Sequence, residues 1–223
     1  MNEIIQTIAV YALPVLFAIT LHEAAHGYAA RYFGDKTAYM LGRVSLNPAK
    51  HIDPFGTIVL PIVMFAATAA TGSPFIFGYA KPVPVDFGKL RNPKRDMVWV
   101  AFAGPAANFA MALIWLLLLV ALQASHVQET FFVAMANAGV LTNLVIFALN
   151  LFPLPPLDGG RVLVGLLPHK YAFKVAKLEP YGFFIVMILA MTNLLFSFWI
   201  GPLMFITEKI LQLIIAPLNF LLN

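Results

Sequence analysis

The chain has 223 residues, of which 61% are hydrophobic and only 11% carry a charged side chain. Soluble globular proteins usually contain about 25% charged residues, so this chain cannot cover the surface of a water-soluble globule. Its apolar runs are continuous and do not alternate with polar residues, which excludes an outer-membrane β-barrel. Composition therefore predicts an all-α polytopic membrane protein with a single domain over residues 1–223.

The positive net charge of +4 does not indicate nucleic-acid binding. Thirteen of the fourteen Lys and Arg residues fall into three short clusters between apolar segments, a pattern typical of the cytoplasmic loops of membrane proteins. We therefore expect the lipid bilayer, and no nucleic acid, as a partner. The chain has no cysteine, so any zinc ion must be held by His, Asp or Glu side chains.

Residues 4–33 form the first apolar segment, which is long enough to cross the hydrocarbon core of a membrane. It begins without the basic residues of a signal peptide, and we expect it to be retained. Arg31 and Lys36 open a basic cluster at its C-terminal end, which predicts that this end lies on the cytoplasmic side.

This first segment contains the motif His22-Glu23-Ala24-Ala25-His26. Residues four positions apart lie on one face of a helix, so His22 and His26 can bind one metal ion together. Glu23 lies beside them, where it could accept a proton from a water molecule at that metal. Three ionisable groups in one turn of an apolar helix are costly without a function. The motif therefore predicts a metal site inside the membrane, nearer the cytoplasmic leaflet.

The region after the first span predicts no simple transmembrane helix. Residues 40–54 are polar and contain Gly, Pro and Asn, which favours a strand or turn at the membrane surface. Residues 55–77 are apolar, but basic clusters flank them on both sides. We favour a segment that enters the membrane and returns without crossing it. The alternative is an ordinary span, with one loop breaking the charge rule.

Further apolar segments predict additional spans over residues 97–123, 131–152 and 179–200. Residues 202–222 predict either a last span or a helix that lies in the membrane interface. The total is five to six transmembrane helices, with a catalytic core over about 4–165 and C-terminal helices over 179–223.

A catalytic zinc usually has three protein ligands and an open fourth position, so the histidine pair needs one more ligand. Asp158 follows three prolines in the segment NLFPLPPLDGG, which cannot continue a helix. Irregular backbone at membrane depth must be buried in protein or line a cavity, and on this ground we favour Asp158. The alternative third ligands are His51, Asp53, Glu129, Glu179 and Glu208.

Two asparagines are further candidates near this site. Asn150 precedes Asp158 on the same inward run, and its amide could stabilise an oxyanion or hold an extended substrate. Its structural alternative is an interhelical hydrogen bond. Asn108 closes the small-residue motif AGPAAN, which allows close helix packing, and for Asn108 we favour a packing role.

These motifs resemble the site-2 protease family of intramembrane zinc metalloproteases. HEAAH, AGPAAN and NLFPLPPLDGG occur in the family's order, and the resemblance extends over about residues 18–165. It implies hydrolysis of peptide bonds within or beside the membrane in transmembrane protein substrates, as in regulated intramembrane proteolysis, in a bacterial plasma membrane. It also implies one Zn²⁺ ion with the ligands His22, His26 and Asp158, Glu23 as general base and Asn150 as a substrate contact.

Residues 42–56 and 78–86 are similar to a compact bacterial subgroup, in which this region forms strands that help to admit the substrate. We expect no PDZ or nucleotide-binding domain of the kind that many relatives carry. A membrane metal transporter or a non-catalytic scaffold with the same ligands is the alternative, although a transporter more often shows an internal repeat. The sequence is compatible with a homo-oligomer.

Overall fold

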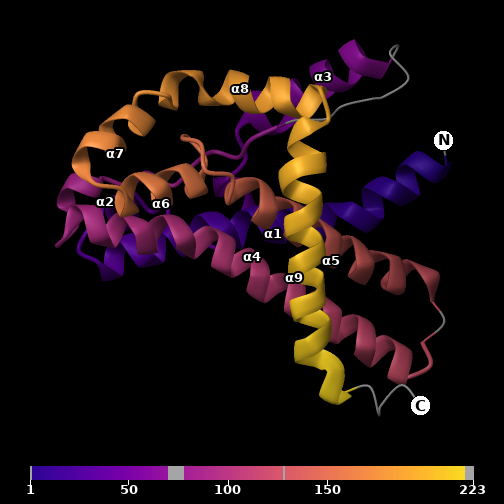
Figure 1. The fold of residues 1–223 in the computed structure, drawn as a ribbon. Coiled ribbons are helices and arrows are strands. Elements are labelled where there is room, and N and C mark those ends of the chain that lie inside the picture. The colour runs from indigo at the N-terminus through magenta and orange to yellow at the C-terminus, as the bar shows by residue number, and fades with distance from the viewer. Residues whose placement is uncertain (1, 70–77, 128, 219–223) are drawn as a thin grey trace.

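The computed structural model of the chain describes residues 2–69, 78–127 and 129–218 (Figure 1). These residues are mostly helical and contain no strand. The all-α class that composition predicts is therefore confirmed. The strands expected from the family resemblance are not confirmed.

Four helices in the described residues are long and apolar enough to cross a membrane. The spanning stretches are Ile5–Tyr32, Pro93–Ala124, Thr130–Asn150 and Phe196–Leu218. They correspond to α1 (Asn2–Tyr32), α4 (Pro93–Ala124), α5 (Thr130–Asn150) and the continuous pair η4 (Phe196–Ile200) and α9 (Gly201–Ile215). This set of helices makes the chain an integral membrane protein.

The predicted number of five to six spans is not confirmed. The segment 179–200 was expected to be one span, but its helix α8 (Glu179–Met191) has only 13 residues. A helix of that length extends about 20 Å, less than the roughly 30 Å hydrocarbon core. Asn193 ends the run with a positive φ of 60°, a conformation that Asn tolerates better than most residues. The chain then restarts as η4, and the apolar residues after 202 continue that helix.

Between α1 and α4 the chain forms short helical elements joined by irregular segments. They are α2 (Thr37–Met40), η1 (Pro48–Lys50), η2 (Pro54–Val59), α3 (Leu60–Ala69) and η3 (Phe87–Lys89). Asn47 and Asp53 cap η1 and η2 by accepting backbone N–H groups, which favours turns over strand pairing. Residues 70–77 of the predicted re-entrant segment lie outside the described residues, so its re-entry stays a prediction.

Small side chains line the contacts among α1, α4 and α5, which pack against one another. The most deeply buried apolar residues on these helices include Ala18, Ala30, Ala112, Ala136 and Ala148, all fully buried. Membrane helices associate by close van der Waals packing, because lipid supplies no hydrophobic force between them. The three helices thus form the framework that holds the polar groups described below.

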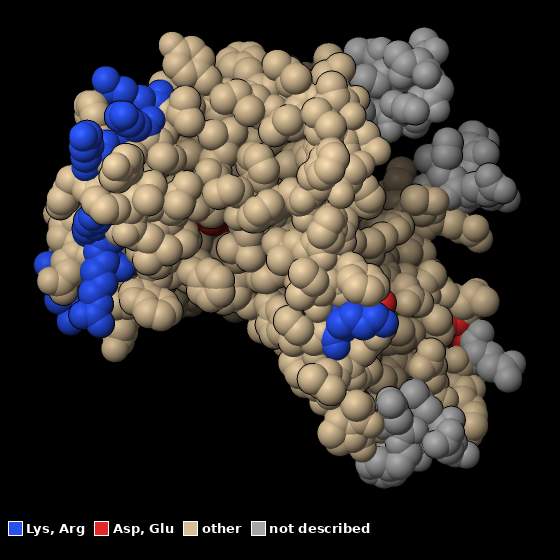
Figure 2. Space-filling model, in the orientation of Figure 1, with Lys and Arg blue, Asp and Glu red and all other residues tan. Residues whose placement is uncertain are grey.

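Beyond α5, the helices α6 (Asp158–Leu166) and α7 (His169–Ala176) complete one end of the molecule, with α6 packed against α4 (Figure 1). Figure 2 shows Lys and Arg side chains gathered at this same end, where α2 and α7 lie in Figure 1. Most of the rest of that face carries no charge. Such a one-sided distribution is typical of a membrane protein with a cytoplasmic end.

Candidate metal centre

Three side chains from distant parts of the chain meet in one cluster. The Nε2 atoms of His22 and His26 lie 3.1 Å apart. Oδ2 of Asp158 lies 3.2 Å from His22 Nε2 and 3.4 Å from His26 Nε2. The side chains are only 8%, 12% and 13% exposed, respectively. The structure thus brings together the histidines of α1 and the carboxylate at the start of α6.

The triangle has the dimensions of one face of a tetrahedral zinc site. Zinc bonds of about 2.0–2.2 Å at tetrahedral angles separate neighbouring ligand atoms by about 3.3–3.6 Å. The measured separations of 3.1, 3.2 and 3.4 Å lie at or just below this range. Asp158 Oδ2 is moreover buried without a hydrogen bond, which a bound cation would explain. The residues present therefore fit one zinc ion.

Each imidazole is held at its other nitrogen by a carbonyl oxygen. His22 Nδ1 donates to Asn108 Oδ1 at 2.6 Å, and His26 Nδ1 donates to the main-chain oxygen of Val100 at 2.7 Å. A carbonyl oxygen can only accept, so in the neutral imidazoles both protons are on Nδ1 and both Nε2 atoms carry a lone pair. Two lone pairs at 3.1 Å repel each other unless a cation lies between them. This arrangement prepares both Nε2 atoms for a metal.

Gly104 of the AGPAAN motif lets α4 pass directly over the histidines. A Cβ atom at this position would lie 2.6 Å from Cε1 of both His22 and His26, and closer still to His26 Nε2. No larger residue fits there without moving an imidazole. One turn later, the same helix places Asn108 against His22.

The segment between α5 and α6 positions Asp158 at the first turn of α6. Gly159 and Gly160 allow α6 to pack on this segment, because Cβ atoms there would collide with the main chain of Leu151 and of Pro155. The Asp158 carboxylate supplies the anionic oxygen ligand of the cluster, which must be deprotonated to bind a metal.

Glu23 lies next to the cluster, and one of its oxygens has a main-chain partner. The N–H of Val83 donates to Glu23 Oε2 at 2.7 Å. Val83 is buried and belongs to the irregular segment 78–86. A Cβ atom on Gly27 would lie 3.2 Å from Val83 Cγ1, so this segment runs close against α1. The bond orients the carboxylate that the sequence predicts as general base.

Asn150, the other predicted catalytic residue, is the last residue of α5. Its Nδ2 donates to the main-chain oxygen of Ile146 at 3.0 Å within the same helix. No described contact joins it to the three-residue cluster, and its role in binding substrate stays a prediction.

The alternative third ligands lie outside the cluster. In the ranges that the structure describes, the group that could hold a metal consists of His22, His26 and Asp158. His51 bonds through Nε2 to the main-chain oxygen of Ser45 at 2.8 Å. The other candidates have other partners or positions: Asp53 caps η2, Glu129 precedes α5, Glu179 pairs with Arg161 and Glu208 bonds Gln212.

The sequence-based prediction of a packing role for Asn108 missed its contact with His22, and Asn143 was not singled out at all. Both are fully buried, and Asn108 Nδ2 donates to Asn143 Oδ1 at 2.9 Å. The available signal was the spacing of Gly104 and Asn108, which places both on the face of α4 that meets the histidines.

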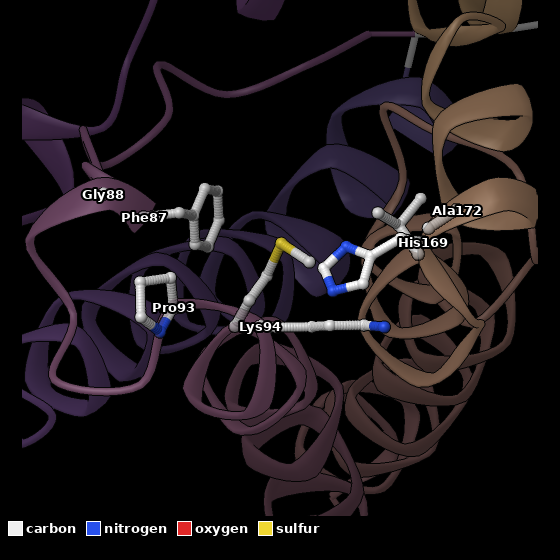
Figure 3. Close-up of a pocket in the computed structure, with 8 residues that line it drawn as sticks. Phe87, Gly88, Pro93, Lys94, His169 and Ala172 are labelled. Carbon is white, nitrogen blue, oxygen red and sulfur yellow. The ribbon is translucent and has the colours of Figure 1, made fainter.

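A separate pocket of about 300 Å³ lies between η3, the start of α4, and helices α6 and α7 (Figure 3). Its lining is mainly apolar and includes Phe87, Met97 and Val164, with Lys94 and His169 as polar members. None of the three cluster residues lines it, so it is distinct from the candidate metal centre.

Comparison with known proteins identifies the family. Residues 10–140 match peptidase family M50. "Putative zinc metalloprotease YwhC" of Bacillus subtilis (strain 168) is 37% identical over 191 residues, which cover 82% of this chain and 80% of that protein. "Putative zinc metalloprotease Rip2" of Mycolicibacterium smegmatis is 31% identical over 177 residues, which cover 79% of this chain and 64% of that protein. No solved structure matches the chain. The chain therefore belongs to peptidase family M50, the site-2 protease family of zinc metalloproteases.

Proposed function

We propose that the protein is an intramembrane zinc endopeptidase that hydrolyses peptide bonds within or next to the transmembrane segments of other membrane proteins. Family membership establishes a metalloprotease. The observation that carries the finer proposal is the buried triangle of His22, His26 and Asp158, two members of which lie on a helix of membrane-spanning length. A protease with its ligands at that depth is suited to substrates that lie in the bilayer.

The position of the histidines along α1 supports an active site nearer the cytoplasmic leaflet. His22 and His26 precede Tyr32, the last residue of the helix, by ten and six residues. At about 1.5 Å per residue, they lie roughly 15 and 9 Å from that end. The basic residues begin at the same end with Arg31, which the charge rule places in the cytoplasm. Because the similar proteins named above are bacterial, we assign the protein to a bacterial plasma membrane.

The residues of the cluster and Glu23 divide the chemistry between them. His22, His26 and Asp158 would hold the zinc ion, which when bound lowers the pKa of water and polarises a peptide carbonyl. Glu23 accepts a proton from the attacking water and delivers it to the leaving amine. The Val83 N–H holds one oxygen of Glu23, which keeps the carboxylate oriented during this transfer.

Two segments are proposed to handle the substrate. The irregular segment 78–86 reaches the general base through Val83, which supports the expectation that this region helps to admit the substrate. Asn150 ends the helix that leads to Asp158, and we assign it to contacts with the substrate main chain. Both assignments extend the family resemblance to this chain.

The test is cleavage of a transmembrane reporter in proteoliposomes by the wild type and by Glu23→Gln. We expect wild-type fragments that end inside the transmembrane segment, identified by mass spectrometry. Glu23→Gln should retain one equivalent of zinc and cleave about 10²–10⁴ times more slowly, the usual contribution of a general base. Fragments that end only in soluble loops would contradict the intramembrane proposal. Zinc transport by the wild type without any cleavage would favour the transporter.

A further inference from the structure

Two buried asparagines form a line of hydrogen bonds that ends at His22. Asn143 Nδ2 donates to the main-chain oxygen of Gly139 at 2.8 Å. Asn108 Nδ2 donates to Asn143 Oδ1 at 2.9 Å and to the main-chain oxygen of Ala18 at 3.2 Å. His22 Nδ1 completes the line by donating to Asn108 Oδ1 at 2.6 Å. Both asparagines are fully buried. The line therefore runs from α5 through α4 to α1.

The direction of every bond in this line follows from its main-chain ends. The oxygen of Gly139 can only accept, so Asn143 must turn its NH₂ group toward it and its Oδ1 toward Asn108. Asn108 must then present its own NH₂ group to Asn143 and to Ala18. Its Oδ1 is left facing His22, which must donate from Nδ1. Neither amide can turn over without placing like groups together in a buried site, where unpaired polar groups are costly.

We propose that Asn143 and Asn108 are positioning residues that hold His22 in the tautomer with a free Nε2 lone pair, with Asn143 acting through Asn108. The inference rests on the proposed function only in taking His22 as a metal ligand. It goes further by assigning to α5 a role in metal affinity through Asn143, which bonds Asn108 and reaches His22 only through it. Partners of this kind at a metal-bound imidazole typically change metal affinity by about 10–100-fold.

His26 provides an internal comparison. Its Nδ1 donates to the main-chain oxygen of Val100, a partner that no side-chain substitution removes. The tautomer of His22, in contrast, depends on side chains alone. Substitutions at Asn108 and Asn143 should therefore change the tautomer of His22 and leave that of His26 unchanged.

The experiment measures two quantities on the purified full chain in detergent. Zinc affinity is obtained by competition with a chelator of known affinity. The histidine tautomers are read from imidazole ¹⁵N chemical shifts of the zinc-free protein, at a pH where the imidazoles are neutral. Asn108→Leu should weaken zinc binding by about 10–100-fold and give a mixture of His22 tautomers. Asn143→Leu should have a smaller effect in the same direction, because Asn108 keeps its bond to Ala18.

Two further variants separate positioning from packing. Asn108→Asp retains an acceptor for His22 Nδ1 and should preserve the single His22 tautomer, although it loses the donor to Asn143 and Ala18 and should lower stability. Thr207→Val is the buried control, because Thr207 is only 3% exposed and its hydroxyl donates to the main-chain oxygen of Leu203 within α9. It should leave both readouts unchanged.

Unchanged zinc affinity and a single His22 tautomer in folded Asn108→Leu would overturn the proposal. If Asn108→Leu does not fold, the same two measurements are made on Asn143→Leu. Unchanged zinc affinity and a single His22 tautomer in that variant would then overturn the proposal. Equal loss of zinc in Thr207→Val would also overturn it, since general loosening of the bundle would then explain the result. Failure of the reporter cleavage assay with zinc bound would contradict the proposed function and leave this inference standing.

Discussion

His22 Nε2 lies 3.2 Å from Asp158 Oδ2, across 136 positions of sequence. The histidine is held from the far side by Asn108, and the aspartate is carried by a helix that two glycines allow to approach closely. The contact therefore depends on three separate packing relationships, of α1 with α4, of α4 with α6, and of α6 with the segment before it. Each can be disturbed separately, and the first prediction below does so at the contact of α1 with α4.

Gly104→Ala should reduce zinc affinity and proteolysis together. The added Cβ atom would meet both imidazoles at 2.6 Å or less, so at least one histidine must move away from the metal position. We expect the variant to fold, because the three atoms nearest to the added Cβ belong to side chains and not to the main chain. Zinc titration and reporter cleavage are the measurements. Gly88→Ala is the control, since its nearest neighbour is the Asp86 side chain at 3.2 Å, and full zinc affinity in Gly104→Ala would contradict the prediction.

Asp35→Asn should destabilise the protein more at neutral than at acidic pH. Burial raises the pKa of the Asp35 carboxyl, but hydrogen bonds from the N–H groups of Thr37 and Asp86 outweigh burial and lower that pKa. A lowered pKa means that the carboxylate stabilises the fold above its unfolded-state pKa, and that this contribution is lost as the pH falls through the folded-state pKa. The expected loss at pH 7 is about 1–3 kcal/mol, typical of hydrogen bonds to a charged group.

Thermal unfolding in detergent between neutral and acidic pH measures this difference for wild type and Asp35→Asn. The two curves should converge as the pH falls. A gap that stays constant over the whole range would show that charge on Asp35 does not stabilise the loop after α1.

Trp199→Phe should lower stability without impairing the chemistry. Trp199 Nε1 donates to the main-chain oxygen of Ala148 at 2.9 Å, and its ring packs edge-on against Phe152 at 5.5 Å. Phenylalanine retains the ring packing and loses the donor, which should cost about 1 kcal/mol. Zinc binding should remain unchanged, because the lost hydrogen bond joins Trp199 to the end of α5 and to none of the three cluster residues. Thermal unfolding and zinc affinity of the purified variant are the measurements. A loss of zinc affinity at unchanged thermal stability would contradict the prediction, because η4 would then contribute to the metal site directly.

The three residues that meet in the candidate metal centre could be inferred from the sequence, because each left a local signal. His22 and His26 are four residues apart on an apolar helix, and Asp158 follows a run of three prolines within four residues, which interrupts a helix. The free-energy cost of burying ionisable groups then favoured Asp158 among the candidate third ligands, since ionisable groups at membrane depth need a function. The all-α class followed from composition, because continuous apolar runs with few charged residues predict membrane-spanning helices.

The features that sequence-based prediction missed depend on tertiary contacts or on backbone conformations that leave no local signal in the sequence. The span over 179–200 ends early because Asn193 adopts a left-handed conformation, which no hydropathy pattern reveals. The partnership of Asn108 with Asn143 joins two helices and has no fixed spacing. Asn47 and Asp53 cap the short helices η1 and η2 by accepting backbone N–H groups. The sequence does not reveal these caps, because polar residues with Gly and Pro are equally compatible with the end of a strand.

The central claim is that His22, His26 and Asp158 hold one zinc ion. The most direct measurement is metal analysis and zinc affinity of the purified wild type beside His22→Ala and Asp158→Ala. The account predicts one equivalent of tightly bound zinc in the wild type and its loss in both variants, with the helical content retained. One equivalent retained by Asp158→Ala at wild-type affinity would contradict it, because the carboxylate would then not be a ligand.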